Sequence, residues 1–152
     1  METTEKSIEV LNDLIEINND RIDGFNRAAE GLGEGDADLK AVFEQFASDS
    51  RENVQELSAA VGQAGGDVDT GNTVTGSLHR AWLNVKATFS GHDRKAILEE
   101  CERGEDAIKK AYRDALSEDN GLSVEQTQLI SKQQGAINVG HDRIKALRDS
   151  QA

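Results

Sequence analysis

Apolar residues recur every three or four positions along four long stretches of the chain, and this spacing predicts four amphipathic α-helices. The predicted helices cover residues 5–31, 36–64, 92–118 and 122–149, and the chain contains no proline to interrupt them. Helices of this kind are expected to bury their apolar faces against one another. In the first helix the inward positions, apolar except for one asparagine, are Ile8, Leu11, Ile15, Asn18, Ile22, Phe25, Ala29 and Leu32.

The connections between the predicted helices are of two kinds. Glycine-containing turns near residues 31–35 and 120–121 are short enough to join antiparallel neighbours, whereas residues 65–91 are too many for a turn. This long segment has its own helical spacing of apolar residues, which predicts a short helix at residues 73–89. Two antiparallel hairpins joined by one long crossover is the connectivity of ferritin-like four-helix bundles. We therefore predict an all-α fold, a ferritin-like four-helix bundle with a short fifth helix in its crossover, as one domain over residues 1–152.

Polar side chains stand near the middle of the predicted inward faces. Antiparallel pairing in the first hairpin puts Asn18 level with Ser50, and Asn53 follows Ser50 by about one turn. Pairing in the second hairpin brings Gln134 to the same height, level with Asp106 and Glu105. We therefore predict a polar layer across the centre of the bundle, at the height where a metal-binding relative would hold its ligands.

The ligands of a dinuclear metal site are largely missing from this layer. A di-iron or di-manganese bundle takes a glutamate from each of two helices and a Glu-x-x-His pair from each of the other two. The chain has three histidines, and no glutamate stands three residues before any of them. One interpretation is a hydrogen-bonded layer that fixes the register of the helices and binds no cofactor. The alternative is a degenerate or single-metal site that uses Glu102, Glu105 and His141.

No combination of side chains in the sequence predicts a catalytic residue. The tetrapeptide Gly-His-Asp-Arg occurs at residues 91–94 and again at 140–143. Adjacent residues on a helix point about 100° apart, so we do not expect the histidine and aspartate of either copy to face each other. Cys101 lies on the inward face of its helix beside three glutamates, which disfavour a reactive thiolate.

The composition limits the class of partner. The net charge of −12 repels nucleic acid and anionic membranes, so we expect neither as a partner. No apolar run approaches the length of a membrane span, and the first residues are polar. A single cysteine excludes an internal disulfide and suits a reducing compartment. We therefore expect a cytoplasmic protein.

The first predicted helix carries more apolar surface than one neighbouring helix can cover. Val10, Leu14 and Ile17 form a second apolar stripe beside the first one. Either the crossover segment or a second copy of the chain is expected to cover this stripe. We expect a homodimer that forms through these three residues.

Four short segments carry a resemblance to a known family. They are Leu-Asn-Asp-Leu-Ile-Glu at residues 11–16, Gly-Ser-Leu-His-Arg-Ala-Trp at 76–82, Glu-Arg-Gly-Glu-Asp at 102–106 and His-Asp-Arg-Ile at 141–144. With these segments, nearly the whole chain resembles a bacterial family of ferritin-like four-helix-bundle proteins that is catalogued mainly as a domain of unknown function. The resemblance implies a ferritin-like fold and a link to stress or stationary-phase physiology. It implies no particular activity, ligand or catalytic residue.

The function that agrees with these features is non-enzymatic. We expect a stress-associated bundle that acts through protein contacts or homodimerisation. One alternative is a metal-binding, di-iron-like oxidase or storage protein with an atypical site. Another alternative is a small-molecule binder that uses the polar layer as a pocket. Metal analysis of protein purified without chelators distinguishes the first two hypotheses.

Overall fold

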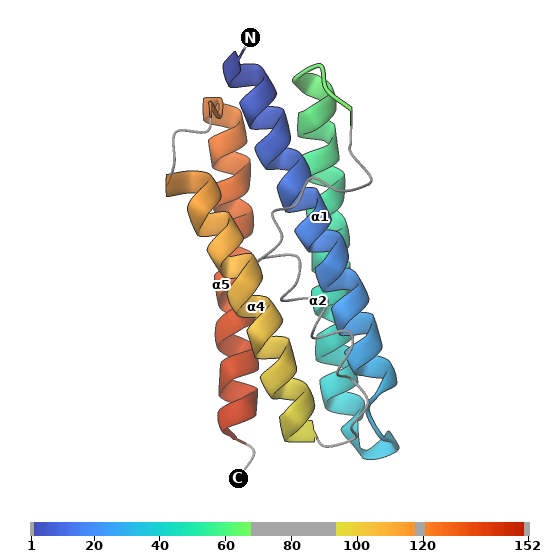
Figure 1. Cartoon of the computed structure of the whole chain (residues 1–152). Coiled ribbons are helices and arrows are strands. Elements are labelled where there is room, and N and C mark those ends of the chain that lie inside the picture. Colours follow the sequence, from blue (N-terminus) through green and yellow to red (C-terminus); the bar gives the residue numbers. More distant parts are fainter. Residues whose placement is uncertain (1, 68–93, 118–120, 151–152) are drawn as a thin grey trace.

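The computed structural model describes residues 2–67, 94–117 and 121–150. Within these residues the fold consists of helices and contains no strand (Figure 1). The four predicted long helices are confirmed, with small differences at their ends. The fifth helix predicted at residues 73–89, and the crossover around it, lie outside the described residues. The helices are α1 (Glu2–Glu30), a short 3-10 helix η1 (Glu34–Asp36), α2 (Ala37–Gln63), α4 (Arg94–Ser117) and α5 (Val124–Asp149).

The four long helices lie side by side as two hairpins (Figure 1). α1 packs against α2 and α4 packs against α5, while α1 also contacts α4 and α2 also contacts α5. α2 ends at the end of the bundle where α1 begins, and α4 begins at the opposite end, so α2 and α4 run in the same direction (Figure 1). Each helix therefore has antiparallel neighbours on two sides, and the four inward faces meet along the bundle axis.

Local hydrogen bonds define where the helices begin and end. α2 ends in a Schellman motif, in which Gly65 adopts a φ of 84° and the Gly66 N–H donates to the Val61 carbonyl at 3.0 Å. α5 begins with a capping box, in which the Gln126 N–H donates to Ser123 Oγ at 3.1 Å and the Ser123 N–H donates to the Gln126 side chain at 2.8 Å. These bonds satisfy backbone groups that have no partner inside the helices.

The core of the bundle is apolar towards both ends and polar in the middle. All four long helices contribute buried apolar side chains, and along α1 these occur both before and after the buried Asn18 and Arg21. Phe25, Phe43 and Phe46 pack together in the core, with the Phe25 ring centroid 5.4 Å from each of the other two. Among the described helices, none has a stretch apolar enough to pass through a lipid bilayer.

The second apolar stripe of α1 is covered within a single chain. Leu14 and Ile17 are only 2% and 1% exposed, and Val10 is partly buried against the core. The apolar surface of α1 is wide because this helix contacts both α2 and α4. Leu14 and Ile17 therefore offer no free surface to a second copy, and the homodimer stays a prediction without the contact face proposed for it.

Candidate functional site

The centre of the bundle holds a buried ion pair between α1 and α4. The side chains of Arg21 and Glu105 are 2% and 0% exposed. Arg21 Nε donates to Glu105 Oε1 at 2.6 Å, and Arg21 Nη2 donates to Glu105 Oε2 at 3.1 Å. In this bidentate geometry the planar guanidinium matches the carboxylate, which makes the contact stronger and more specific than a single hydrogen bond. Two opposite charges thus neutralise each other away from water.

The other two helices complete the surroundings of the Arg21 guanidinium. From α2, Ser50 Oγ accepts a hydrogen bond from Arg21 Nη1 at 3.0 Å. The ring centroids of Phe46, also on α2, and of Phe25, on α1 itself, lie 5.3 Å from the guanidinium carbon, a distance at which aromatic rings attract a cation. From α5, Gly140 contributes only backbone, and a β-carbon at this position would lie 3.0 Å from Arg21 Nη2. The missing side chain lets α5 lie directly on the ion pair.

Hydrogen bonds continue from the ion pair to amide side chains at the same height. Ser50 Oγ donates to Asn18 Oδ1 at 2.9 Å, and Asn53 Nδ2 donates to the same oxygen at 3.2 Å. The Asn18 Nδ2 group donates to the Leu14 carbonyl and to the Tyr112 hydroxyl, both at 2.8 Å. Asn18 thus uses both its oxygen and its nitrogen, and it joins α1, α2 and α4.

The hydrogen bonds reach the surface between α2 and α5. The Tyr112 hydroxyl donates to Gln133 Oε1 at 2.7 Å, and Gln133 Nε2 donates to Glu56 Oε1 at 3.1 Å. Glu56 Oε2 pairs with Lys132 Nζ at 2.7 Å. The hydrogen bond from Lys132 lowers the pKa of Glu56, whereas burial raises the pKa of Tyr112 well above its ordinary value, so the phenol keeps its proton. We refer to the buried members of this set as the central network: Asn18, Arg21, Ser50, Asn53, Glu105, Tyr112 and Gln133.

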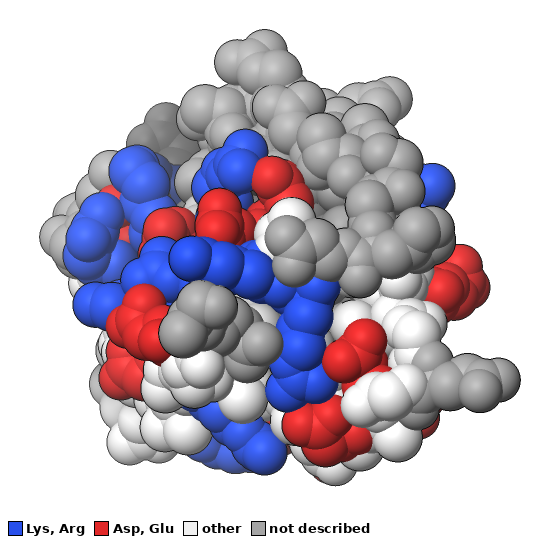
Figure 2. All heavy atoms as spheres, turned by 90° about the horizontal axis from the view of Figure 1, so that it is seen from below, with Lys and Arg blue, Asp and Glu red and all other residues white. Residues whose placement is uncertain are grey.

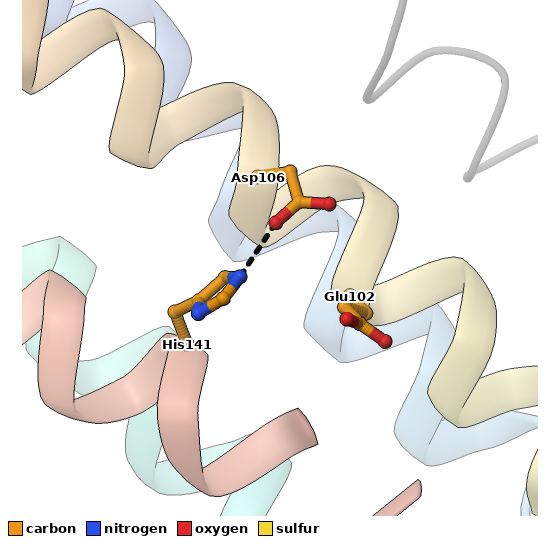
Figure 3. A group of neighbouring side chains, drawn as sticks. All are labelled: Glu102, Asp106 and His141. Atoms are coloured by element: carbon orange, nitrogen blue, oxygen red, sulfur yellow. Dashed lines mark hydrogen bonds and ion pairs between the residues drawn. The ribbon is translucent and has the colours of Figure 1, made fainter.

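A second group of polar side chains lies near the surface between α4 and α5 (Figure 3). Glu102 and Asp106 are about one turn apart on α4, and His141 points toward Asp106 from α5 (Figure 3). His141 Nε2 lies 2.5 Å from Asp106 Oδ1, and possible ligand atoms of the three side chains all lie within 4.8 Å of one another. On the other side of the ring, His141 Nδ1 lies 3.3 Å from Asp142 Oδ1. We refer to Glu102, Asp106 and His141 as the outer cluster.

Positive side chains border the outer cluster. Arg148 on α5 forms ion pairs with Glu102 and, at 2.7 Å, with Asp149. These residues and Asp106 belong to the lining of a pocket of about 500 Å³, to which Lys95 and Arg103 also contribute. The Asp106 side chain is 60% exposed, so the cluster is reachable from solvent. The pocket thus combines convergent carboxylates with cations that compete for them.

Most of the chain matches a known family of proteins. The model of the family described as Domain of unknown function (DUF2383) matches residues 6–118. The chain belongs to this family. The match covers nearly all of α1 and the whole of α2 and α4, so the DUF2383 region supplies both members of the Arg21–Glu105 pair, whereas α5, with Gly140 and His141, lies beyond it. No curated protein matches this chain.

The DUF2383 chain brings together most of the residues that its sequence pattern puts in a polar layer. Asn18, Ser50 and Asn53 are buried and joined by hydrogen bonds. Gln134 differs from the prediction, because it is partly exposed and the neighbouring Gln133 takes its place. Steps of three and of four residues both stay on one face of a helix, so the spacing alone does not separate these two glutamines.

Arg21 and Tyr112 belong to the central network and are missing from the residues singled out in the sequence. An arginine is rarely fully buried, so Arg21 is not expected in the core, and the sequence pattern does not distinguish a lone tyrosine from an ordinary core residue. A signal was nevertheless present in the spacing. Arg21 follows Asn18 by three residues, and Tyr112 follows Glu105 by seven, so each shares a helix face with a residue already placed in the layer.

The three residues considered as metal ligands from the sequence fall into two different places. Glu105 belongs to the central network, where Arg21 holds both of its oxygens. Glu102 and His141 belong to the outer cluster, and Asp106 is the third member of that group. The expectation that His141 and Asp142 do not face each other is wrong, because the ring and the carboxylate reach around the helix to within 3.3 Å.

Cys101 is a packing residue in this DUF2383 protein. Its side chain is fully buried. Burial raises the pKa of the thiol well above its ordinary value, and the charges of Glu105 and Glu100 add to the effect. The thiol therefore stays protonated and behaves as a small apolar group.

Proposed function

We propose that this protein is a ferritin-like four-helix bundle whose central network is structural, and that it acts without catalysis, through contacts with other proteins. The observation that carries the proposal is the buried, bidentate ion pair of Arg21 and Glu105. Its guanidinium supplies positive charge at the height where metal ions supply it in a dinuclear ferritin-like bundle.

The directions of the helices support the ferritin-like part of the proposal. α2 and α4 run the same way although they are consecutive long helices of the described chain (Figure 1). A chain that returns from one end of the bundle to the other between its two hairpins has the single long crossover of ferritin-like folds. In an up-down-up-down bundle consecutive helices alternate in direction, so that topology matches less well.

The charge balance of the central network supports a structural role. Glu105 is the network's one carboxylate, and Arg21 neutralises it. Two divalent cations at the same place would need several more carboxylate or imidazole ligands. A cation that displaced Arg21 would leave a buried guanidinium without its partner, at a cost of roughly 3–5 kcal/mol. The network instead fixes the register of the helices, because a shift of one helix would break several hydrogen bonds at once.

The charge pattern of the surface supports a role in protein contacts. At the end of the bundle seen in Figure 2, Lys and Arg atoms form a band that is bordered by Asp and Glu. One contact between the two signs joins Arg94, at the start of α4, to Asp36 at 2.9 Å and to Asp38 at 3.0 Å. A surface of mixed sign can be matched by the complementary pattern of another protein, whereas the uniformly negative backbone of a nucleic acid meets repulsion.

The proposal also includes a cytoplasmic location, a stress-related role and a homodimer. The single buried cysteine suits a reducing compartment, and the stress-related role rests on the resemblance of the sequence segments. Light scattering tests the homodimer. We expect a particle of about twice the chain mass of 16.5 kDa, and a mass equal to one chain would remove this part of the proposal.

Metal analysis tests whether the central network is structural. Wild-type protein and a Glu105→Gln variant are purified without chelators, with Glu100→Gln as a control that changes a glutamate outside the network. We expect no iron or manganese whose retention depends on Glu105. A stoichiometric, redox-active metal that is lost in folded Glu105→Gln protein, and kept in Glu100→Gln protein, would favour the metal-dependent oxidase or storage protein instead.

A further inference from the structure

The outer cluster gathers one imidazole and two carboxylates from two helices without being part of the central network. We propose that Glu102, Asp106 and His141 bind one divalent transition-metal ion, for which zinc is the simplest occupant. The site lies on the face between α4 and α5 (Figure 3) and is separate from the bundle interior, where Glu105 and Arg21 neutralise each other. A metal bound here is compatible with a structural central network, so this inference goes beyond the proposed function.

The geometry of the outer cluster is close to that of a metal site. Glu102 and Asp106 are four residues apart on α4, so their carboxylates lie on one helix face. Possible ligand atoms of these residues and of His141 lie within 4.8 Å of one another. Ligands bound at roughly 2.0–2.2 Å to a tetrahedral zinc ion are about 3.5 Å apart, so small side-chain rotations bring the three groups onto one ion.

The two carboxylates around His141 favour a positive charge at the ring. Nδ1 lies 3.3 Å from Asp142 Oδ1, and Nε2 lies 2.5 Å from Asp106 Oδ1. A neutral imidazole carries one N–H and can donate to only one of these carboxylates. If Nδ1 donates to Asp142, the lone pair of Nε2 faces an oxygen lone pair of Asp106. A metal ion that binds both atoms, after they move apart by about 1 Å, removes this repulsion. A carboxylate on the far nitrogen of a metal-binding histidine is also the usual way in which its ring is oriented.

The chemistry of the ligands selects the class of ion. Imidazole together with carboxylates suits zinc and other first-row divalent ions, whereas magnesium and calcium prefer oxygen ligands alone. The His141 side chain is 10% exposed, while that of Asp106 is 60% exposed. The ion therefore reaches the site from the solvent side and contacts a ring that the bundle already holds in place.

Arg148 is the competitor of the metal. Its guanidinium forms an ion pair with Glu102 and lines the same pocket of about 500 Å³. Arg148 thus supplies part of the positive charge that the two carboxylates attract, and a metal ion must displace it to use Glu102. Removal of the guanidinium should therefore strengthen metal binding, which a role of Arg148 as a mere surface residue does not predict.

Zinc titration calorimetry on metal-free protein at neutral pH tests the site. His79 and His92 are first replaced by glutamine, so that His141 is the one histidine left. In this background we expect one zinc ion per chain and a weaker response to magnesium. Asp106→Asn and His141→Gln should each weaken zinc binding about tenfold or more, because each removes a ligand. Arg148→Gln should strengthen binding several-fold.

The control variant is Asp114→Asn, which changes a carboxylate further along α4 that pairs with Lys110 at 2.8 Å. It should leave zinc binding unchanged. Asp106→Asn alters an exposed side chain and is expected to fold, so it keeps the test decisive if His141→Gln does not fold. Zinc affinity that is unaffected by Asp106→Asn, or the lack of any binding at millimolar zinc, would overturn the proposal. Either outcome leaves the proposal about Arg21 and Glu105 untouched, because the two sites share no residue.

Discussion

Glu105 and Asp106 are adjacent residues of α4, yet their carboxylates have opposite surroundings. Glu105 is fully buried, and Arg21 binds both of its oxygens. The Asp106 side chain is 60% exposed, and it contacts His141 at 2.5 Å. Because adjacent helical residues point about 100° apart, one helix supplies a carboxylate to the interior and another to the outer face. The surroundings of a carboxylate, rather than its residue type, decide its role. A buried carboxylate paired with arginine maintains the fold, whereas an exposed one can exchange the group that it contacts.

The difference between the two carboxylates is one of solvation. A charge in the interior has no water to replace a lost partner, so the removal of either member of the Arg21–Glu105 pair is costly. An exposed carboxylate is solvated with or without its partner, so its contacts contribute little to stability. The outer cluster can therefore change its occupant at a small cost in folding free energy, whereas the central network cannot.

Removing the charge of each carboxylate in turn gives the largest contrast. Glu105→Gln leaves the Arg21 guanidinium buried without a counter-charge, and we expect the free energy of unfolding to fall by roughly 3–5 kcal/mol. Asp106→Asn removes an exposed group and should change this free energy by about 1 kcal/mol or less. Urea unfolding followed by circular dichroism measures both values. Equal losses in the two variants would contradict the comparison.

A double variant serves as the control for the interior. When Arg21→Met and Glu105→Leu are combined, no buried charge is left alone, and we expect much of the stability lost in Glu105→Gln to return. If the double variant is as unstable as Glu105→Gln, the intact ion pair itself stabilises the fold. The loss in Glu105→Gln would then not come from the buried charge that is left alone.

Tyr112→Phe tests the hydrogen-bonded part of the central network. The substitution removes two buried hydrogen bonds, the one that Asn18 Nδ2 donates to the hydroxyl and the one that Gln133 Oε1 accepts from it. We expect a loss of roughly 2–3 kcal/mol in the free energy of unfolding. Gln45→Ala, which breaks an exposed hydrogen bond to Asp49, should stay within about 0.5 kcal/mol of the wild type. Similar values for both variants in urea unfolding would show that burial of the network is unimportant.

Two glycines of α5 test the close approach of this helix to the ion pair. In Gly140→Ala the new methyl group would lie 3.0 Å from Arg21 Nη2 and 3.4 Å from Glu105 Oε2, so we expect a loss of about 1–2 kcal/mol. Gly135→Ala meets no atom within 4 Å and should gain up to about 1 kcal/mol from the higher helix propensity of alanine. The midpoint temperature of thermal unfolding should fall in Gly140→Ala and rise in Gly135→Ala. A higher midpoint temperature in Gly140→Ala would contradict the close packing of α5 on the ion pair.

The ionisation of Tyr112 gives a signal from the interior alone, because the chain has one tyrosine. Burial raises the pKa of this phenol, so the folded state keeps its proton at a pH where the unfolded state loses it. The resulting stabilisation is fully present below the ordinary pKa of 10.0 and is lost as the pH rises above it, by about 1.4 kcal/mol per pH unit. Tyrosinate absorbance at alkaline pH should appear only with unfolding. Ionisation near the ordinary pKa in folded protein would show that water reaches the network.

The smallest effect is expected at the exposed end of the bundle. The side-chain hydrogen bond from Arg94 lowers the pKa of Asp38 to about 2 from its ordinary 3.8. A lowered pKa stabilises the fold above the ordinary value, and this contribution is lost as the pH falls through the folded value. An NMR titration should show the pKa of Asp38 returning toward 3.8 in Arg94→Gln, with little change in unfolding at neutral pH. A large loss of stability in Arg94→Gln at neutral pH would contradict the contrast between exposed and buried ion pairs.

The helices and part of the central network follow from sequence spacing, because the spacing is repeated many times along each helix. Asn18, Ser50 and Asn53 interrupt apolar stripes, which makes them visible as buried polar residues. Gln133 and Arg21 are harder to place. The choice between Gln133 and Gln134 depends on a small rotation of α5 about its axis, and burial of Arg21 depends on a carboxylate and a glycine that other helices supply.

The outer cluster could be predicted only in part. His141 stands out as one of only three histidines and lies on the inward-facing stripe of its helix, and Glu102 is a candidate ligand beside it, but the third member depends on the mutual rotation of α4 and α5. That rotation turns Glu105 into the interior and Asp106 toward His141. A sequence reports which residues share a face of one helix, whereas the meeting of faces from two helices is a property of their packing.

The lack of a side chain at Gly140 links the residue allowed on α5 to the residue allowed at position 21 on α1. A buried Arg21 is accommodated best by a glycine at position 140, because a side chain there would press on the guanidinium. Descendants that exchanged the arginine for an aliphatic residue would be free to take alanine or serine on α5. In a set of related sequences these two positions should therefore change together, although they lie near opposite ends of the chain.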